Sequence, residues 1–174
     1  AGFFAGRSKE QAAAGPTADP SAPAPAGAQA DTLGIPSGTG WTAENADKLP
    51  TLEIWEDFQC PACGDFEAAF GPTVDELVAG GDAQVIFRST SFLDQNFPGD
   101  NSKRAAAAFG CAVDAGKGPE YKKVVYANQP ATEGEGWTDQ QLLAFGEQAG
   151  ITGDAKSTFD KCVTDRTYIT WAVN

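Results

Sequence analysis

Two closely spaced thiols are the side chains of this sequence best suited to chemistry: Cys60 and Cys63, in the stretch EDFQCPAC. The stretch follows an apolar segment and precedes a helical pattern, so a helix is predicted to begin at about Cys60. There, free backbone N–H groups and the positive end of the helix dipole favour a thiolate and lower the pKa of the thiol. We therefore expect Cys60 to attack and form a mixed disulfide, and the less polarised Cys63 to resolve it. Pro61 has no N–H group and suits the first helical turn, and Ala62 completes the C-P-A-C motif.

Two other uses of the cysteines are less well supported by the sequence. A zinc site of four cysteines normally contains two close pairs, whereas Cys111 and Cys162 lie 51 positions apart in separate helical patterns, and the chain has no histidine. A purely structural bridge between Cys60 and Cys63 would close so small a loop that it would stabilise little. The absence of histidine also excludes Ser-His and Cys-His nucleophiles. We predict redox chemistry of the thiols themselves, with no metal and no cofactor.

The residues around the motif predict one strand-helix-strand unit. The segment TLEIWEDF (51–58) is rich in β-branched and aromatic residues, which is typical of a buried strand. Apolar residues between positions 66 and 78 recur at spacings of three or four, which predicts a helix kinked near Pro72 and ended by the glycines at 80–81. The segment AQVIFRSTSFL (83–93) predicts a second strand, and a right-handed crossover would place it parallel to the first.

A run of helical patterns follows. The predicted helices are 102–116 with Ser102 as its cap, 119–128, 138–150 with a capping box of Thr138 and Gln141, and a last one from about residue 154. Four helices after one strand-helix-strand unit indicate a helical block that is inserted into, or appended to, an α/β domain. We place the domain at residues 41–174 and the helical insertion at residues 99–174.

The first 40 residues differ from the rest in composition. Residues 1–40 are rich in Ala, Gly and Pro and have few apolar side chains to bury, which predicts a flexible linker or tether. The stretch AGFFAGRSK at its start is compatible with the end of a removed signal or membrane anchor. No run of 18 apolar residues occurs in the chain. The net charge of -12 argues against a nucleic-acid partner, because nothing would neutralise a row of phosphates.

The stretch EDFQCPAC, the kinked helix, the second strand and a helical SKRAAAAFGCA together resemble the DsbA-like branch of the thioredoxin superfamily, over roughly residues 48–174. The resemblance implies a thioredoxin-like α/β fold with a helical insertion. It implies an extracytoplasmic thiol-disulfide oxidoreductase, in a periplasm-like space or the cell envelope, that introduces disulfides into reduced exported polypeptides. It also implies a membrane re-oxidase of the DsbB or vitamin-K-epoxide-reductase type as partner. Two alternatives stay open: a disulfide reductase or isomerase with the same site, and a catalytically idle binding or chaperone module.

Two features of the chain depart from that branch. Its members often carry a buried acid six residues before the first cysteine, where this chain has Ile54. Glu56, on the same face of the predicted strand, is our candidate for proton transfer. The superfamily also places a cis-proline beside the cysteine pair and finishes with two strands and a helix. No proline after Cys63 fits that place, so we expect the sequence to stop short of the natural C-terminus, with the C-terminal strands and the cis-Pro loop missing.

The resemblance also bears on the remaining cysteines and on nearby aromatic residues. In an exported protein an even number of cysteines favours pairing, so we predict a structural disulfide between Cys111 and Cys162. Among the aromatic residues near the motif along the chain, Phe58 and Phe97 are predicted to line an apolar substrate groove. Phe97 ranks first because it lies in a loop beside Pro98, whereas an aromatic residue in a strand more often belongs to the core.

Overall fold

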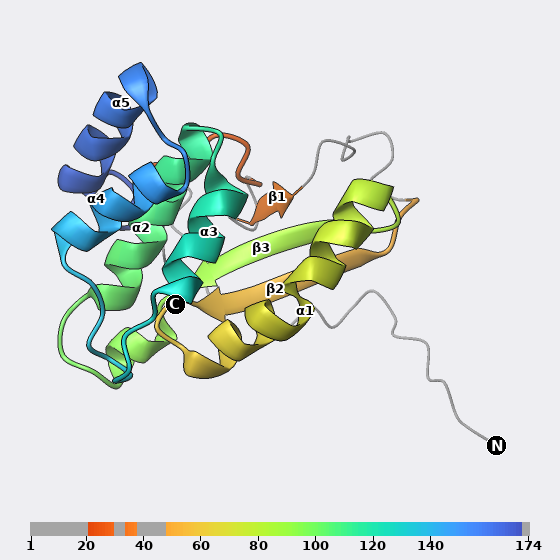
Figure 1. Ribbon diagram of the computed structural model, residues 1–174, viewed down its shortest axis with the longest axis horizontal. Helices are drawn as coiled ribbons and strands as arrows, with labels where there is room; N and C mark the ends of the chain where they lie inside the picture. Colours follow the sequence, from red (N-terminus) through yellow and green to blue (C-terminus); the bar gives the residue numbers. More distant parts are fainter. Residues whose placement is uncertain (1–20, 30–33, 38–47, 172–174) are drawn as a thin grey trace.

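The computed structural model describes residues 21–29, 34–37 and 48–171. Within them, a mixed sheet with the strand order β1-β3-β2 lies beside a block of helices (Figure 1). The strands are β1 (Ile35–Ser37), β2 (Thr51–Asp57) and β3 (Gln84–Thr90). β2 runs parallel to β3 and β1 runs antiparallel to it. Among the described residues β2 is therefore an edge strand, and it leads directly into the cysteine motif.

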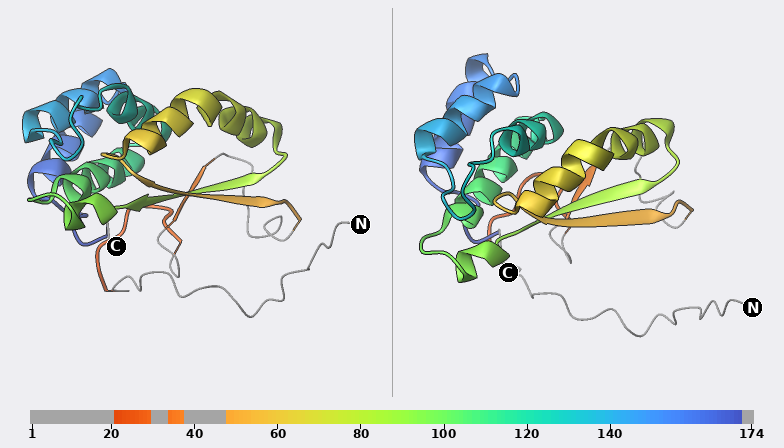
Figure 2. Two further views of the ribbon diagram at one scale, coloured as in Figure 1. Left: turned by 90° about the horizontal axis from the view of Figure 1, so that it is seen from below. Right: turned by 60° about the horizontal axis from the view of Figure 1, so that its bottom comes forward.

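Helix α1 (Pro61–Gly80) connects β2 to β3 and lies over one face of the sheet (Figure 2), so the predicted strand-helix-strand unit is confirmed. The helix ends where predicted, because Gly81 takes a φ of 70°, a left-handed value that glycine adopts without strain. Pro72 lies inside the helix, where it cannot donate a hydrogen bond to the carbonyl of Ala68.

The predicted series of four helices after the second strand is also confirmed. A short 3-10 helix, η1 (Phe92–Gln95), leads into α2 (Asn101–Asp114), α3 (Gly118–Ala127), α4 (Asp139–Gln148) and α5 (Gly153–Thr164). The capping box is present: the backbone N–H of Gln141 donates to Oγ1 of Thr138 at 3.2 Å, and that of Thr138 donates to Oε1 of Gln141 at 2.8 Å. The four helices form one block (Figure 1). It lies at the end of the sheet where β2 ends and α1 begins.

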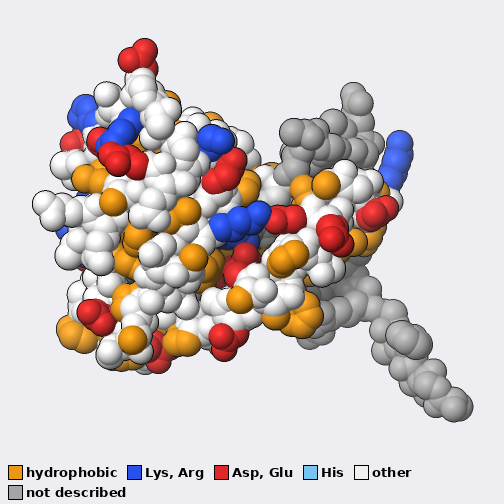
Figure 3. All heavy atoms as spheres, viewed as in Figure 1, with side chains coloured by type: hydrophobic (Ala, Val, Ile, Leu, Met, Phe, Trp, Pro, Cys, Tyr) orange, Lys and Arg blue, Asp and Glu red, His pale blue; other side chains and the backbone are white. Residues whose placement is uncertain are grey.

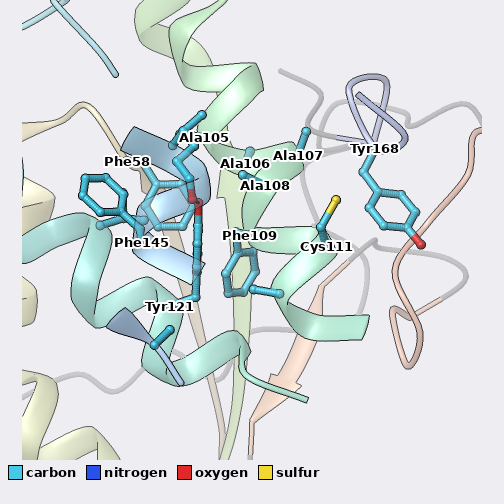
Figure 4. Packing of buried hydrophobic residues seen from close by; sticks show 14 of the residues in the cluster. Phe58, Ala105, Ala106, Ala107, Ala108, Phe109, Cys111, Tyr121, Phe145 and Tyr168 are labelled. Atoms are coloured by element: carbon cyan, nitrogen blue, oxygen red, sulfur yellow. Dashed lines mark hydrogen bonds between the residues drawn. The ribbon is translucent and has the colours of Figure 1, made fainter. Parts of the chain in front are cut away.

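The core joins this helical block to the sheet. The alanine-rich α2 is buried along most of its length, and Figure 4 shows its alanines and Phe109 among the rings that surround them. Phe58, fully buried just after β2, lies with its ring centroid 5.6 Å from that of Phe109 and 5.1 Å from that of Tyr126. Cys111 of α2 and Cys162 of α5 form a disulfide, with their Cα atoms 5.8 Å apart. The segment that carries the cysteine motif is thus anchored in the helical block.

Part of the predicted linker over residues 1–40 belongs to the sheet, so that boundary is wrong. Residues 35–37 form β1, in which Ile35 is buried and lies opposite Phe87 of β3. Pro36 is tolerated because β1 is an edge strand in the described sheet. The linker prediction otherwise falls mostly on residues outside those described.

The predicted cap of the first helix in the block is also wrong. Ser102 is fully buried inside α2, and its Oγ accepts a hydrogen bond from Nε2 of Gln59 at 2.7 Å. The helix start is capped instead by Asp94 of η1, whose carboxylate accepts from the backbone N–H groups of Ser102 at 2.8 Å and Lys103 at 3.0 Å. The cap therefore comes from eight residues upstream, which a local motif does not reveal.

Charged side chains meet where the helical block borders α1 (Figure 3). Lys122 of α3 pairs with Glu67 of α1, and Lys123 pairs with Asp75, each at 2.5 Å. These pairs tie α3 to the helix that begins at the cysteine motif.

No helix in the described part of the chain is both long and apolar enough to span a bilayer.

Candidate redox site

The turn from β2 to α1 places the two thiols at the start of the helix. Cys60 is the residue immediately before α1, with extended φ and ψ of -74° and 117°, and Pro61 is the first helical residue. The carbonyl of Cys60 accepts hydrogen bonds from the backbone N–H groups of Cys63 and Gly64, both at 3.1 Å. Within the described residues no side chain caps α1. Cys60 therefore lies where free N–H groups and the positive end of the helix dipole converge.

Cys60 and Cys63 are both free and partly exposed, and their surroundings differ. The pKa of the Cys63 thiol is raised to about 12, chiefly by burial. The nearby sulfur of Cys60 and the charge of Glu56 contribute to the same rise. Cys63 thus holds its proton at neutral pH. One sulfur stands at the helix start, beside the free backbone N–H groups of α1, and a protonated thiol lies one turn further on.

Glu56 lies on the buried face of β2, close enough to Cys63 for its charge to affect that thiol. Its side chain is 3% exposed and that of Ile54 is 7% exposed, whereas Trp55 between them is 48% exposed, so the predicted alternation is confirmed. The hydroxyl of Tyr126 and the carboxyl group of Glu67 lie close enough to the carboxylate of Glu56 to affect its pKa. Burial, and next the charge of Glu67, raise the pKa of Glu56 to about 7. This carboxyl group can take up or release a proton near neutral pH.

A buried ion pair lies beside Glu56. The side chains of Lys122 and Glu67, paired at 2.5 Å, are only 14% and 8% exposed, and Nζ of Lys122 also lies 4.8 Å from the ring centre of Phe87. Two carboxyl groups, those of Glu56 and Glu67, therefore share one ammonium group. If both were ionised the buried cluster would carry an excess negative charge, which adds to the effect of burial in raising the pKa of Glu56. Within the described residues no cluster of three or more acidic or cysteine side chains could hold a metal ion.

Asp57 shapes the turn, a role that the sequence did not reveal. The residue is fully buried at the end of β2. Its Oδ1 accepts from the backbone N–H of Gln59 at 2.9 Å, and its Oδ2 accepts from that of Leu93 at 3.0 Å. An aspartate that binds its own backbone two residues on is a common turn signal, which could have been recognised, whereas the bond to Leu93 could not.

An open hollow borders Cys63 at the edge of β2. It is lined by Leu52, Trp55 and Phe66, with other residues from β2 and the first turns of α1. Figure 3 shows apolar side chains gathered along the border of α1, and Phe70, whose ring centroid lies 5.5 Å from that of Phe66, is 56% exposed. The hollow is thus an apolar surface next to Cys63.

The residues predicted to line a substrate groove lie elsewhere. Phe58 is fully buried in the core, so that prediction is wrong. The reason is that the chain turns inward after β2, where the rings of α2 and α3 surround this side chain. Phe97 is half-buried, its ring lies against Gly134, and it is not among the described residues that line the hollow.

The strand-helix-strand unit with a C-P-A-C motif at the start of its helix, extended by a helical block, defines a thioredoxin-like fold. Residues 42–174 match the family described as Thioredoxin, and the chain belongs to that family. No curated protein matches the chain.

Several solved structures with the same fold carry the names of bacterial disulfide oxidoreductases. The reduced form of the disulfide bond oxidoreductase DsbG from Mycobacterium tuberculosis is 30% identical, with a TM-score of 0.61 over 70% of this chain and 59% of that one. Oxidised DsbA from the same organism is 27% identical, with a TM-score of 0.67 over 80% of this chain and 74% of that one. MdbA from Actinomyces oris is 17% identical, with a TM-score of 0.64 over 80% and 67%, and supports the fold alone. The chain thus spans 59% of the DsbG structure.

Proposed function

We propose that this protein is an extracytoplasmic thiol-disulfide oxidoreductase that introduces disulfides into exported proteins through Cys60 and Cys63. The observation that carries the proposal is the asymmetry of the two thiols: Cys60 precedes the first residue of α1, whereas burial raises the pKa of Cys63 to about 12. The names of the similar M. tuberculosis structures, a disulfide bond oxidoreductase and DsbA, support the same chemistry.

The proposed reaction begins with the Cys60–Cys63 disulfide. A substrate thiolate attacks Sγ of Cys60, a substrate–Cys60 disulfide forms, and the intramolecular S–S bond breaks to release Cys63 as a thiolate. A second substrate thiolate then attacks the substrate sulfur of the mixed disulfide, which forms the substrate disulfide and releases Cys60 as a thiolate. Two electrons pass from the substrate to the protein. In the reverse direction Cys60 is the attacking thiol and Cys63 resolves the mixed disulfide.

Glu56 is proposed to exchange the proton of Cys63. When the disulfide opens, the Cys63 sulfur leaves as a thiolate in a site where burial favours the neutral thiol, so a proton must arrive. The carboxyl group of Glu56 has its pKa raised to about 7 and is buried on the strand that leads to the motif, so it can supply that proton near neutral pH. On re-oxidation the same carboxylate can take the proton back.

Stabilisation of the Cys60 thiolate by the helix start favours the reduced form of the protein, which makes its disulfide an oxidant. This is the physical reason for proposing disulfide formation rather than reduction. A membrane re-oxidase of the DsbB or vitamin-K-epoxide-reductase type would then restore the Cys60–Cys63 disulfide.

The test compares two activities. The oxidised protein is assayed for oxidative refolding of a reduced, unfolded substrate, and the reduced protein is assayed for reduction of insulin. We expect rapid oxidative refolding and little insulin reduction. Cys60→Ser should abolish the refolding activity, whereas the matched control Ala62→Ser, which places a serine in the same motif but keeps both thiols, should retain it. Faster insulin reduction than refolding would favour a reductase, and activity that survives Cys60→Ser would favour a binding module.

A further inference from the structure

The end of α3 binds the backbone of the redox turn at three carbonyl groups. Nε2 of Gln129, two residues after α3, donates to the carbonyl of Phe58 at 2.8 Å and to that of Cys60 at 2.9 Å. The hydroxyl of Tyr126, inside α3, donates a longer hydrogen bond to the carbonyl of Asp57 at 3.5 Å. The helical block therefore supplies the donors for the backbone that holds the first cysteine, and Gln129 supplies the two short bonds.

The position of Gln129 is fixed on both sides. Its backbone N–H donates to the carbonyl of Tyr126 at 3.3 Å, and the indole Nε1 of Trp137 donates to the carbonyl of the preceding Asn128 at 2.8 Å. On the other side its amide packs against α1 at Gly64, where an added Cβ would lie 2.2 Å from Oε1 of Gln129. Glycine at position 64 thus leaves the space that lets this amide reach the turn.

These two hydrogen bonds act on the electrostatic surroundings of Cys60. A carbonyl oxygen carries a partial negative charge, and one belongs to Cys60 itself and one to Phe58, two residues before it. The positive end of the Gln129 amide dipole offsets both, close to a sulfur that must hold a full negative charge when the disulfide opens. Without the amide, the two carbonyl oxygens would repel the Cys60 thiolate more strongly. The uncharged disulfide would be affected less, so the loss of the amide would disfavour the reduced form.

We propose that Gln129 is a positioning residue for the redox turn, and that its amide stabilises the thiolate form of Cys60 by binding the carbonyls of Phe58 and Cys60. The inference rests on the proposed redox role of the cysteine pair. It assigns a part in the chemistry to the helical block: a residue far along the chain sets how strongly oxidising the C-P-A-C disulfide is. A merely structural residue would hold the turn equally in the oxidised and the reduced protein.

The experiment measures the equilibrium of the Cys60–Cys63 pair with reduced and oxidised glutathione in Gln129→Leu, which keeps the size of the side chain and removes both donors. The matched control is Asn128→Leu, because the Asn128 amide donates to the carbonyl of Val124 within α3 and, among the described residues, to no group of the redox turn. We expect Gln129→Leu to shift the equilibrium about fivefold toward the disulfide, the size of one ordinary hydrogen bond. Asn128→Leu should leave this equilibrium unchanged.

A second variant perturbs the same contact from the other side. Gly64→Ala would press its Cβ against Oε1 of Gln129 and displace the amide, so it should shift the glutathione equilibrium in the same direction with Gln129 intact. This keeps the inference testable if Gln129→Leu does not fold. The inference is overturned if neither variant moves the equilibrium by twofold, or if Asn128→Leu moves it as far. Since the equilibrium is measured on the protein alone, a protein that shifts as expected yet oxidises no substrate would refute the proposed function and not this inference.

Discussion

Replacing Glu56 with glutamine removes a buried carboxyl group that ionises near neutral pH. The side chain is 3% exposed, and burial followed by the charge of Glu67 raises its pKa from 4.5 to about 7. In the unfolded chain the same carboxyl group ionises at its ordinary pKa. The folded state therefore binds a proton more tightly than the unfolded state between about pH 4.5 and pH 7.

The sign of the effect follows from this difference. Below about pH 4.5 Glu56 is protonated in both states and costs nothing, whereas above pH 7 it is ionised in both and the folded state carries the full cost of a buried charge. That cost corresponds to about 3 kcal/mol at most. Relative to the native protein, Glu56→Gln should thus gain about 1 to 3 kcal/mol of stability between pH 4 and pH 8.

The assay is urea unfolding of both proteins in the same redox state at pH 4, 6 and 8, with the free energies extrapolated to water. The matched control is Glu76→Gln, which makes the same chemical change at an exposed position of α1. Any fixed cost of burying a glutamine amide cancels, because only the change with pH is compared. A stability difference for Glu56→Gln that is the same at pH 4 and pH 8 would refute the assignment of a perturbed carboxyl group at this site.

Two further outcomes follow from the cysteines. Cys63→Ser should accumulate a mixed disulfide between Cys60 and a disulfide-containing substrate, at least tenfold above the native protein on non-reducing gels, because the resolving thiol is absent. Replacing both Cys111 and Cys162 with alanine should lower the free energy of unfolding by about 4 kcal/mol, because the disulfide closes a loop of 51 residues. The first expectation is contradicted if a mixed disulfide forms equally in Cys60→Ser. The second is contradicted if the double alanine variant is as stable in urea as the native protein.

Local patterns predicted the elements that position the thiols. The capping box at Thr138, the left-handed glycine at position 81 and the start of α1 at the motif all depend on neighbouring residues, and the structure has each of them. The alternation along β2 also placed Glu56 on the same face as Ile54. What the alternation did not predict is how deeply Glu56 is buried among Glu67, Lys122 and Tyr126, because these side chains come from α1 and α3.

The predictions that proved wrong all depend on contacts distant in sequence. Nearness to the cysteines along the chain predicts Phe58 in a groove, yet its ring meets Phe109, about 50 positions along the chain, in the core. The local pattern predicts Ser102 at a helix cap, yet its hydroxyl accepts from Gln59. Composition predicts Ile35 in a linker, yet it pairs with β3. Gln129 has no local signal at all, because its role comes only from where α3 ends in space.

The reduction potential of the Cys60–Cys63 pair, measured against glutathione, tests the central claim most directly. If the helix start stabilises the Cys60 thiolate and burial keeps Cys63 protonated, the disulfide is a strong oxidant. We then predict a reduction potential close to that of DsbA, which is about -120 mV. A potential near the about -270 mV of thioredoxin would contradict the claim that this pair gives disulfides to its substrates.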